Sequence, residues 1–166
     1  MSSKAHKEKI WNYIRDIKVG MLTTQDGDDL RARPMHLVQD DYDGKIWFFT
    51  KHSAEKVFEV KDEHNVCISF CNHDEGIHVS LSGHARLTQD KNLIDQFWSP
   101  FTGAWFEGGK EDPDVALLEI KIYLGEHWEA EDSKAFQLYE IVKSNFTNDT
   151  PDLGENEKFG QSTINK

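Results

Sequence analysis

Two arginines stand two residues apart in the segment Arg31-Ala-Arg-Pro-Met35, a spacing that could bind phosphate. On a β-strand alternate side chains share a face, so Arg31, Arg33 and Met35 should point the same way. A guanidinium group can donate two parallel hydrogen bonds to phosphate oxygens, which suits such a face to a phosphorylated ligand. The same pair is also compatible with an ordinary solvated strand face.

A hydroxyl and a lysine follow the next apolar run, in the segment Phe48-Phe-Thr-Lys-His-Ser-Ala-Glu-Lys56. Ser53 is a suitable N-cap for a short helix that would extend to about Lys61. The first N–H groups of a helix are unpaired and carry partial positive charge, so Ser53 and Lys56 could bind an anion. A helix cap without a ligand explains the same residues.

Strict alternation over residues 77–87 predicts a strand with one buried and one polar face. The apolar face holds Ile77, Val79, Leu81, Ala85 and Leu87, and the polar face holds His78, Ser80, Ser82, His84 and Arg86. His78 and Ser80 could meet the polar edge of a ring, or they could be plain surface residues. Gly83 interrupts the pattern and predicts a bulge or a close approach of another backbone.

Residues 98–114 form an irregular stretch rich in aromatic residues, Gly and Pro. A loop of this length inside a compact domain is usually functional. Its aromatic residues could form an interface, because aromatic side chains concentrate at interface cores. They could also cover the open end of the chain's own barrel. The residues concerned are Trp98, Phe101, Trp105 and Phe106.

The remaining pattern predicts short antiparallel strands with flanking helices, a mainly β (α+β) fold closed into a barrel of six or seven strands. Expected helices cover residues 3–17, 53–61, 90–97 and 134–143. Expected strands cover residues 19–24, 30–38, 45–50, 65–71, 77–87, 115–122 and 125–130. Residues 1–145 should form one domain, and residues 146–166 a polar C-terminal tail.

Charge narrows the possible partners. The net charge is −11, which argues against nucleic acid. The first 86 residues hold 12 basic and 14 acidic residues as well as all four arginines, so this half should bind any phosphate. No apolar stretch reaches the roughly 18 residues that span a bilayer, and we expect no membrane partner and a cytoplasmic location.

Cysteine and histidine are two further residue types that could form a site. Cys67 and Cys71 lie on one strand about 13 Å apart, too far for a disulfide, so both should be buried thiols. No spacing of histidine and cysteine forms a zinc signature, so we expect no metal site.

The ordered motifs resemble the FMN-binding split barrel of the pyridoxamine 5'-phosphate oxidase-like superfamily. They are Arg33-Pro-Met-His, then Trp47-Phe-Phe-Thr50 with Lys56, then Val79-Ser-Leu-Ser-Gly83. Trp105-Phe-Glu-Gly-Gly-Lys-Glu-Asp-Pro113 is similar to a segment of its general stress protein branch, as is Gly125-Glu-His-Trp128. The resemblance covers about residues 5–130.

The resemblance implies an FMN, with FAD possible, at the interface of a homodimer. It implies that Arg33 and Lys56 hold the phosphate, with a hydroxyl from Thr50 or Ser53. Pro34, Met35 and Phe49 would line the ring system, and His78 and Ser80 would approach it or the ribityl chain. Trp105 and Trp128 would come from the partner subunit. The chain departs from the family at Ala54, where serine is usual, and at Glu107, where proline is usual.

The resemblance leaves two functions open. The first is a flavin-dependent oxidoreductase, with NAD(P)H or a small redox substrate and no assigned catalytic residue. The alternative is a flavin carrier or sensor without turnover, and another cofactor such as haem or a deazaflavin is a third possibility. A true pyridoxamine phosphate oxidase is not expected, because its substrate phosphate is held by a C-terminal arginine and this chain has none after Arg86.

Overall fold

Seven antiparallel strands form one curled sheet in the computed structural model, which describes residues 3–54, 64–130, 143 and 155–160. The strands are β1 (Val19–Asp26), β2 (Asp29–His36), β3 (Lys45–Lys51), β4 (His64–Asn72), β5 (Ile77–Thr88), β6 (Val115–Glu129) and β7 (Glu155–Gly160). The order along the sheet is β2-β1-β4-β5-β6-β3, and β7 pairs with β6. This confirms the predicted split barrel.

The two ends of the sheet meet. Leu37, just after β2, forms a bridge with Phe48 of β3. Next to it, the N–H of Val38 donates to the carbonyl of Trp47 at 3.3 Å. The first and last strands of the sheet order are therefore brought together, which curls the sheet into a barrel.

The predicted irregularity at Gly83 is present. The register between β5 and β6 shifts between Ser82 and Gly83, as expected for a β-bulge. A Cβ atom at Gly83 would lie 2.6 Å from Cγ2 of Ile120 and 2.8 Å from the carbonyl oxygen of Lys121. Both interpretations of this glycine, a bulge and a close backbone approach, are correct. The two strands predicted over residues 115–130 are one long strand that continues through this shift.

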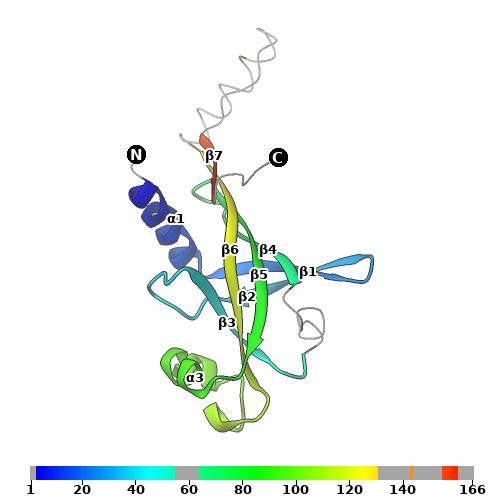
Figure 1. The fold of residues 1–166 in the computed structure, drawn as a ribbon. Helices are drawn as coiled ribbons and strands as arrows, with labels where there is room; N and C mark the ends of the chain where they lie inside the picture. Colours follow the sequence, from blue (N-terminus) through cyan, green and yellow to red (C-terminus); the bar gives the residue numbers. More distant parts are fainter. Residues whose placement is uncertain (1–2, 55–63, 131–142, 144–154, 161–166) are drawn as a thin grey trace.

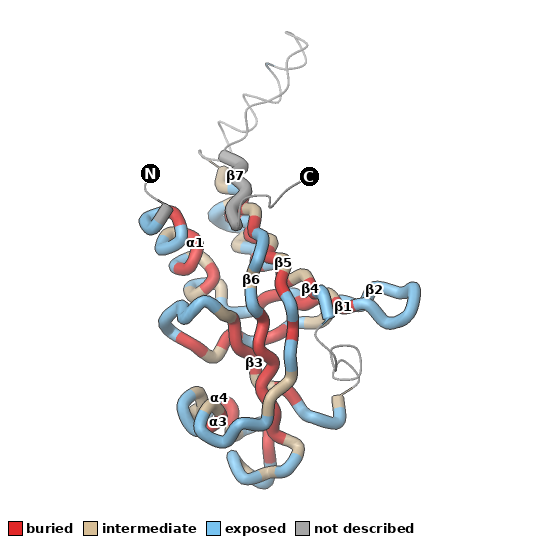
Figure 2. The backbone as a smooth tube through the Cα atoms, in the orientation of Figure 1, coloured by how far each residue is buried: buried red, intermediate tan, exposed pale blue. Residues whose placement is uncertain are grey.

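The main core lies inside the barrel, where the inward residues of the strands meet helix α1 (Ser3–Ile17). Ile10, Trp11 and Ile14 are the buried apolar side of α1, in keeping with the predicted amphipathic pattern. Figure 2 shows the buried positions concentrated on the strands and on one side of this helix, whereas the end of the β1–β2 hairpin is exposed. The indole of Trp11 also donates to the carbonyl of Asp40 at 2.9 Å.

Polar contacts hold the exposed side of α1 to β6. The hydroxyl of Tyr13 donates to Oε1 of Glu129 at 2.7 Å. Nζ of Lys9 lies 2.5 Å from Oε2 of the same carboxylate. Burial raises the pKa of Glu129, but the hydrogen bonds from Lys9 and Tyr13 outweigh it and leave the pKa below its usual 4.5. The carboxylate is therefore stabilised in its charged form by the fold.

Low pH should weaken the attachment of α1 to β6 through Glu129. The pKa of Glu129 is lower in the folded protein than in the unfolded chain, so its carboxylate contributes to stability above pH 4.5. This contribution is lost as the pH falls through the pKa of the folded protein. Glu129→Gln should lower the free energy of unfolding by about 1–2 kcal/mol at pH 7, and the difference from wild type should shrink in acid. Urea unfolding of both proteins at several pH values measures this difference.

Glu8→Gln is the matched control for this prediction. Glu8 pairs with Lys4 at 3.9 Å on the exposed part of the same helix. An exposed pair of this kind contributes little, so this variant should unfold like wild type. Equal losses in the two variants would show that the contact with β6 does not stabilise α1.

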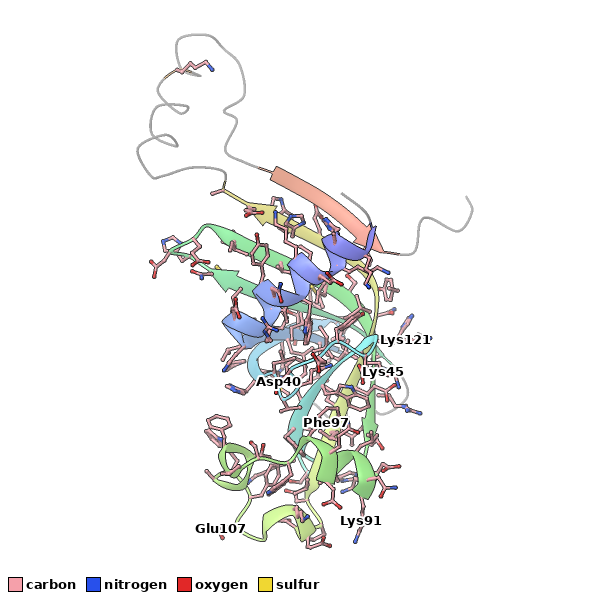
Figure 3. All side chains as sticks on the ribbon, turned by 90° about the vertical axis from the view of Figure 1, so that its left-hand side faces the viewer. Asp40, Lys45, Lys91, Phe97, Glu107 and Lys121 are labelled. Atoms are coloured by element: carbon pink, nitrogen blue, oxygen red, sulfur yellow. The ribbon has the colours of Figure 1, made fainter. Side chains whose placement is uncertain are left out.

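A second, smaller core forms outside the barrel, over β3 and the first half of β6. Trp47, Val115 and Leu117 pack there against Ile94 and Phe106. Ile94 belongs to α3 (Lys91–Phe97), which begins at the predicted cap, where Oδ1 of Asp90 accepts from the N–H groups of Asn92 and Leu93. Figure 3 shows Phe97 on the side of α3 that faces β3. In Figure 1, α1 and α3 lie at opposite ends of the barrel.

The aromatic stretch after α3 is less irregular than expected. It contains the short helix α4 (Pro100–Gly103) and the 3-10 helix η1 (Gly109–Glu111). Oγ of Ser99 accepts from the N–H of Thr102 and thereby caps α4. None of the helices in the described ranges combines the length and the apolar character needed to span a bilayer.

The remaining predictions concern two helices, the C-terminal tail and the two cysteines. Most of the helix expected at residues 53–61 and nearly all of the one expected at 134–143 lie outside the described residues. Strand β7 adds residues of the expected tail to the sheet. Cys67 and Cys71 are both free thiols, but neither is buried as expected: Cys67 is half-buried, and the prediction fails most clearly for Cys71. It lies on the outer face of β4, where it is exposed.

Candidate functional site

A cavity of about 450 Å³ lies beside the junction between β2 and β3. Its position follows from the fold, because these two strands are joined at Leu37 and Phe48 and α4 packs next to them. Its size is typical of a site for a small organic ligand. The lining residues are Val19, Pro34, Met35, His36, Val38, Phe49, Thr50, Lys51, Phe101, Thr102, Trp105 and Phe106.

The walls of the cavity are largely aromatic and differ in how firmly they are held. Phe106 is 5% exposed and belongs to the outer core, with its ring centroid 6.4 Å from that of Phe49. Phe101 and Trp105 also line the cavity but are 55% and 67% exposed. The cavity therefore has one wall fixed by packing and another that faces solvent. A flat ring system fits between aromatic walls of this kind.

Thr50 supplies a buried polar atom at the cavity. The residue is 4% exposed, and its hydroxyl has no hydrogen-bond partner in the described part of the chain. Leaving a buried hydroxyl unsatisfied costs free energy, so such a group needs an explanation. A polar atom of a bound ligand would provide the missing partner.

His36 of β2 also lines the cavity, close to β3, which carries Thr50. Its ring centroid lies 4.6 Å from that of Phe101 on α4. Burial lowers the pKa of His36, and the positive charge of Lys18 lowers it further. The neutral imidazole is therefore favoured, and in that form it can donate one hydrogen bond and accept another.

The structure brings five of the predicted site residues to this cavity, namely Pro34, Met35, Phe49, Thr50 and Trp105. Trp105 lines the cavity of its own chain, whereas the family resemblance implied that it comes from the partner subunit. That these residues bind a flavin remains a prediction.

The side chain of Arg33 is bound to the neighbouring strand β1. Arg33 pairs in register with Leu22 of β1, and its Nη1 donates to Oγ1 of Thr24 at 2.8 Å. It is not among the residues that line the cavity. Lys56, its expected partner at the phosphate, lies outside the described residues.

Ser53 is engaged by a carboxylate. Its N–H and its hydroxyl each donate to Asp114 at 2.7 Å, and the N–H of His52 donates to the Asp114 carbonyl. The hydrogen bond from the Ser53 hydroxyl, followed by that from its N–H, lowers the pKa of Asp114. These contacts fix the turn after β3. The Ser53 hydroxyl could reach a phosphate only by leaving this carboxylate.

His78, Ser80 and Trp128 lie together on the outer face of the sheet. His78 of β5 pairs with Trp128 of β6, and Oγ of Ser80 lies 3.5 Å from Sγ of Cys67. Trp128 is 37% exposed. None of the three lines the cavity of its own chain. They form a second group, separate from the cavity residues.

Sequence reasoning missed several cavity residues, among them His36, Lys51 and Thr102. His36 was detectable in principle, because it shares a strand face with Pro34, two residues earlier. Lys51 directly follows Thr50 but had no pattern of its own. Phe101 and Phe106 belonged to the aromatic stretch that the sequence singled out, although their role as cavity walls depends on how α4 packs.

Comparisons with known proteins match this chain in sequence family and in fold. The model of the family described as pyridoxamine 5'-phosphate oxidase like matches residues 5–152. The chain is 33% identical to a general stress protein 26 of Jannaschia sp. CCS1, whose solved structure gives a TM-score of 0.72 and matches 95% of this chain and 99% of that one.

The general stress FMN/FAD binding protein of Xanthomonas citri is 32% identical, with a TM-score of 0.72 over 79% of this chain and 93% of that chain. Protein bli-3 of Neurospora crassa is 30% identical over 122 residues, which are 67% of this chain. The match spans 58% of the length of that curated relative.

Proposed function

Because this chain belongs to the pyridoxamine 5'-phosphate oxidase-like family, we propose that it binds a flavin, FMN in the first place, in the cavity beside α4. The observation that carries this proposal is the buried Thr50 hydroxyl, which lacks a partner in the described residues at a cavity with aromatic walls. A similar solved structure is that of a general stress FMN/FAD binding protein, so FAD is the alternative flavin.

The residues of the cavity fit a flavin ring. Phe49 and Phe106 offer a fixed apolar wall, Phe101 and Trp105 can cover the ring and exclude water, and Thr50 can hydrogen-bond its polar edge. The phosphate would be held by Arg33 and Lys56, as the family resemblance implies, once Arg33 leaves Thr24. A flavin bound there would supply two-electron chemistry, because the cofactor itself accepts and donates the electrons.

The outer group of His78, Ser80 and Trp128 supports a homodimer in this proposal. The outer sheet face also carries exposed apolar residues away from the cavity lining, with Met21 at 42% and Leu124 at 46% exposure. A second copy packed on this face would cover them and bring the outer group near the partner's flavin. Light scattering after gel filtration should then give the mass of two chains.

We further propose that the flavin takes part in turnover as an oxidoreductase, with NAD(P)H or a small molecule as reductant. The other possibility is a carrier that holds flavin without turnover. Anaerobic addition of NADPH or NADH to the flavin-loaded protein, followed by readmission of oxygen as the oxidant, separates the two. Bleaching of the flavin by the reductant, reoxidation by oxygen and repetition of this cycle support an enzyme, and an unchanged spectrum supports a carrier.

Thr50→Val should weaken FMN binding without lowering the stability of the protein. Valine has nearly the shape of threonine but lacks the hydroxyl, so removing an unsatisfied buried group should leave the free energy of unfolding unchanged or raise it by about 1 kcal/mol. The FMN dissociation constant should rise about 5- to 10-fold, the effect of one lost hydrogen bond. Titration of FMN, followed by its visible spectrum, measures this constant.

Thr102→Val is the matched control at the same cavity. Thr102 is as deeply buried as Thr50, but its Oγ1 lies 3.1 Å from Oγ of Ser99. This variant should therefore lose stability. If Thr50→Val binds FMN as tightly as wild type, the Thr50 hydroxyl does not contact the ligand. If wild type binds neither FMN nor FAD, the proposed function is wrong.

A further inference from the structure

The solvent-facing wall of the cavity lies on a short helix. α4 has 4 residues, and its Phe101 is 55% exposed. Trp105, which follows α4, is 67% exposed, and its ring centroid lies 6.5 Å from that of Phe101. Neither ring belongs to the outer core, which holds the end of this stretch through Phe106. The position of this wall therefore depends in part on contacts between exposed rings.

One such contact joins α4 to strand β2, which also borders the cavity. The imidazole centroid of His36 lies 4.6 Å from the ring centroid of Phe101, and the two ring planes are inclined by 32°. Both residues line the cavity. Among the ring contacts in the described part of the chain, this one joins β2 to α4. Aromatic rings at this separation attract each other, so the contact keeps Phe101 close to β2.

The two partners of this contact differ in how their backbones are held. His36 lies on a paired strand, in register with Val19 of β1, and the preceding residue Met35 is 5% exposed in the main core. Phe101 lies on the short helix α4. The sheet therefore fixes the backbone of His36, and the ring contact ties Phe101 to it. The neutral form that is favoured for His36 packs against the phenyl ring without bringing a charge to the cavity.

We propose that His36 is a positioning residue that holds Phe101 over the cavity and thereby slows the release of a bound flavin. This inference rests on the proposed flavin binding, and it concerns the ring of the flavin and not the phosphate. His36 acts through Phe101 and makes no bond to the ligand. When the contact is lost, Phe101 moves away from β2 more readily and the flavin dissociates faster. The fold is unaffected, because both side chains are exposed.

The test is a double-mutant cycle of His36→Ala and Phe101→Ala, measured with FMN and with riboflavin, which has the same ring and no phosphate. His36→Ala should raise the dissociation constants of both flavins about fivefold, on the scale of one aromatic ring pair. Stopped-flow displacement should show that most of this change is a faster dissociation rate. In the Phe101→Ala background, His36→Ala should have no further effect, because the contact is already absent.

Two further variants sharpen the result. His36→Phe keeps a ring against Phe101 and lacks the nitrogen atoms of the imidazole, so it should restore the dissociation rate of wild type. Tyr42→Ala is the matched control, because it removes a ring from a contact with Trp11 at 5.4 Å, outside the cavity lining. This control should bind both flavins like wild type. Apo His36→Ala should unfold in urea like wild type, since its side chain is exposed.

Additive effects of the two substitutions, or a failure of His36→Phe to restore binding, would show that His36 contacts the ligand directly and would overturn the inference. An effect on FMN alone, or no effect of His36→Ala, would also overturn it. If wild type binds no flavin, the proposed function is wrong and the inference about release is wrong with it. The imidazole proton resonances of His36 in the apo protein distinguish the two failures. They should shift in Phe101→Ala, and unchanged resonances would overturn the positioning role alone.

Discussion

Phe106→Ala is expected to lower the free energy of unfolding by about 3–5 kcal/mol, the cost of removing a buried aromatic ring. Phe106 is 5% exposed and packs with Trp47, Val115 and Leu117 in the outer core. Its loss would leave a void between α3 and the sheet and would remove one wall of the cavity. Urea unfolding of the apo protein measures the first effect, and FMN titration below the unfolding range measures the second.

Phe101→Ala is the matched control, because the same ring is removed from the same cavity. Phe101 is 55% exposed on α4, so its removal should change the free energy of unfolding by no more than about 0.5 kcal/mol. The ring contacts His36, and its loss should still weaken FMN binding. Equal destabilisation by the two variants would mean that the outer core does not depend on Phe106.

Gly83→Ala should lower the free energy of unfolding by about 1–3 kcal/mol, because the added methyl group has no room. Its Cβ would lie 2.6 Å from Cγ2 of Ile120 and 2.8 Å from the backbone carbonyl oxygen of Lys121. The side chain of Ile120 could rotate away. The carbonyl of Lys121 belongs to the paired strand β6 and cannot move without disturbing the bulge. Thermal or urea unfolding of the variant measures the cost.

Gly103→Ala provides the comparison for Gly83. The nearest atom to a Cβ at Gly103 is Cζ2 of Trp98, at 3.7 Å, which is an ordinary contact. Alanine also favours helix over glycine, so this variant should be as stable as wild type or slightly more stable. If Gly83→Ala proves equally harmless, the strands at the bulge are looser than the structure indicates.

The sequence predicted the local features of the fold well. The alternation from Ile77 to Leu87 correctly gave the buried and exposed faces of β5, Gly83 gave the bulge, and Asp90 gave the start of α3. These succeed because side-chain alternation, glycine geometry and helix capping act within a few residues of the chain. The sequence did not show that residues 115–129 continue as one strand through the register shift.

The site was predicted in part. Pro34, Met35, Phe49, Thr50 and Trp105 do meet at one cavity. Arg33 lies next to them in sequence, yet its side chain donates to Thr24, because the paired strand β1 offers an acceptor, and the local motif does not show this contact between strands. The Asp114 contact of Ser53 joins residues 61 positions apart, a separation that local patterns do not reveal.

By itself, the sequence determined most of the strands within residues 19–130, the buried and exposed faces of β5, and that phosphate-binding residue types cluster in the first half. Only the tertiary structure decided where a ligand could bind. The cavity exists because Leu37 meets Phe48 and because α4 packs beside that junction, which places His36, Thr50 and Trp105 around one space. Long-range strand pairing and packing set these contacts, and neither leaves a periodic pattern in the amino-acid sequence.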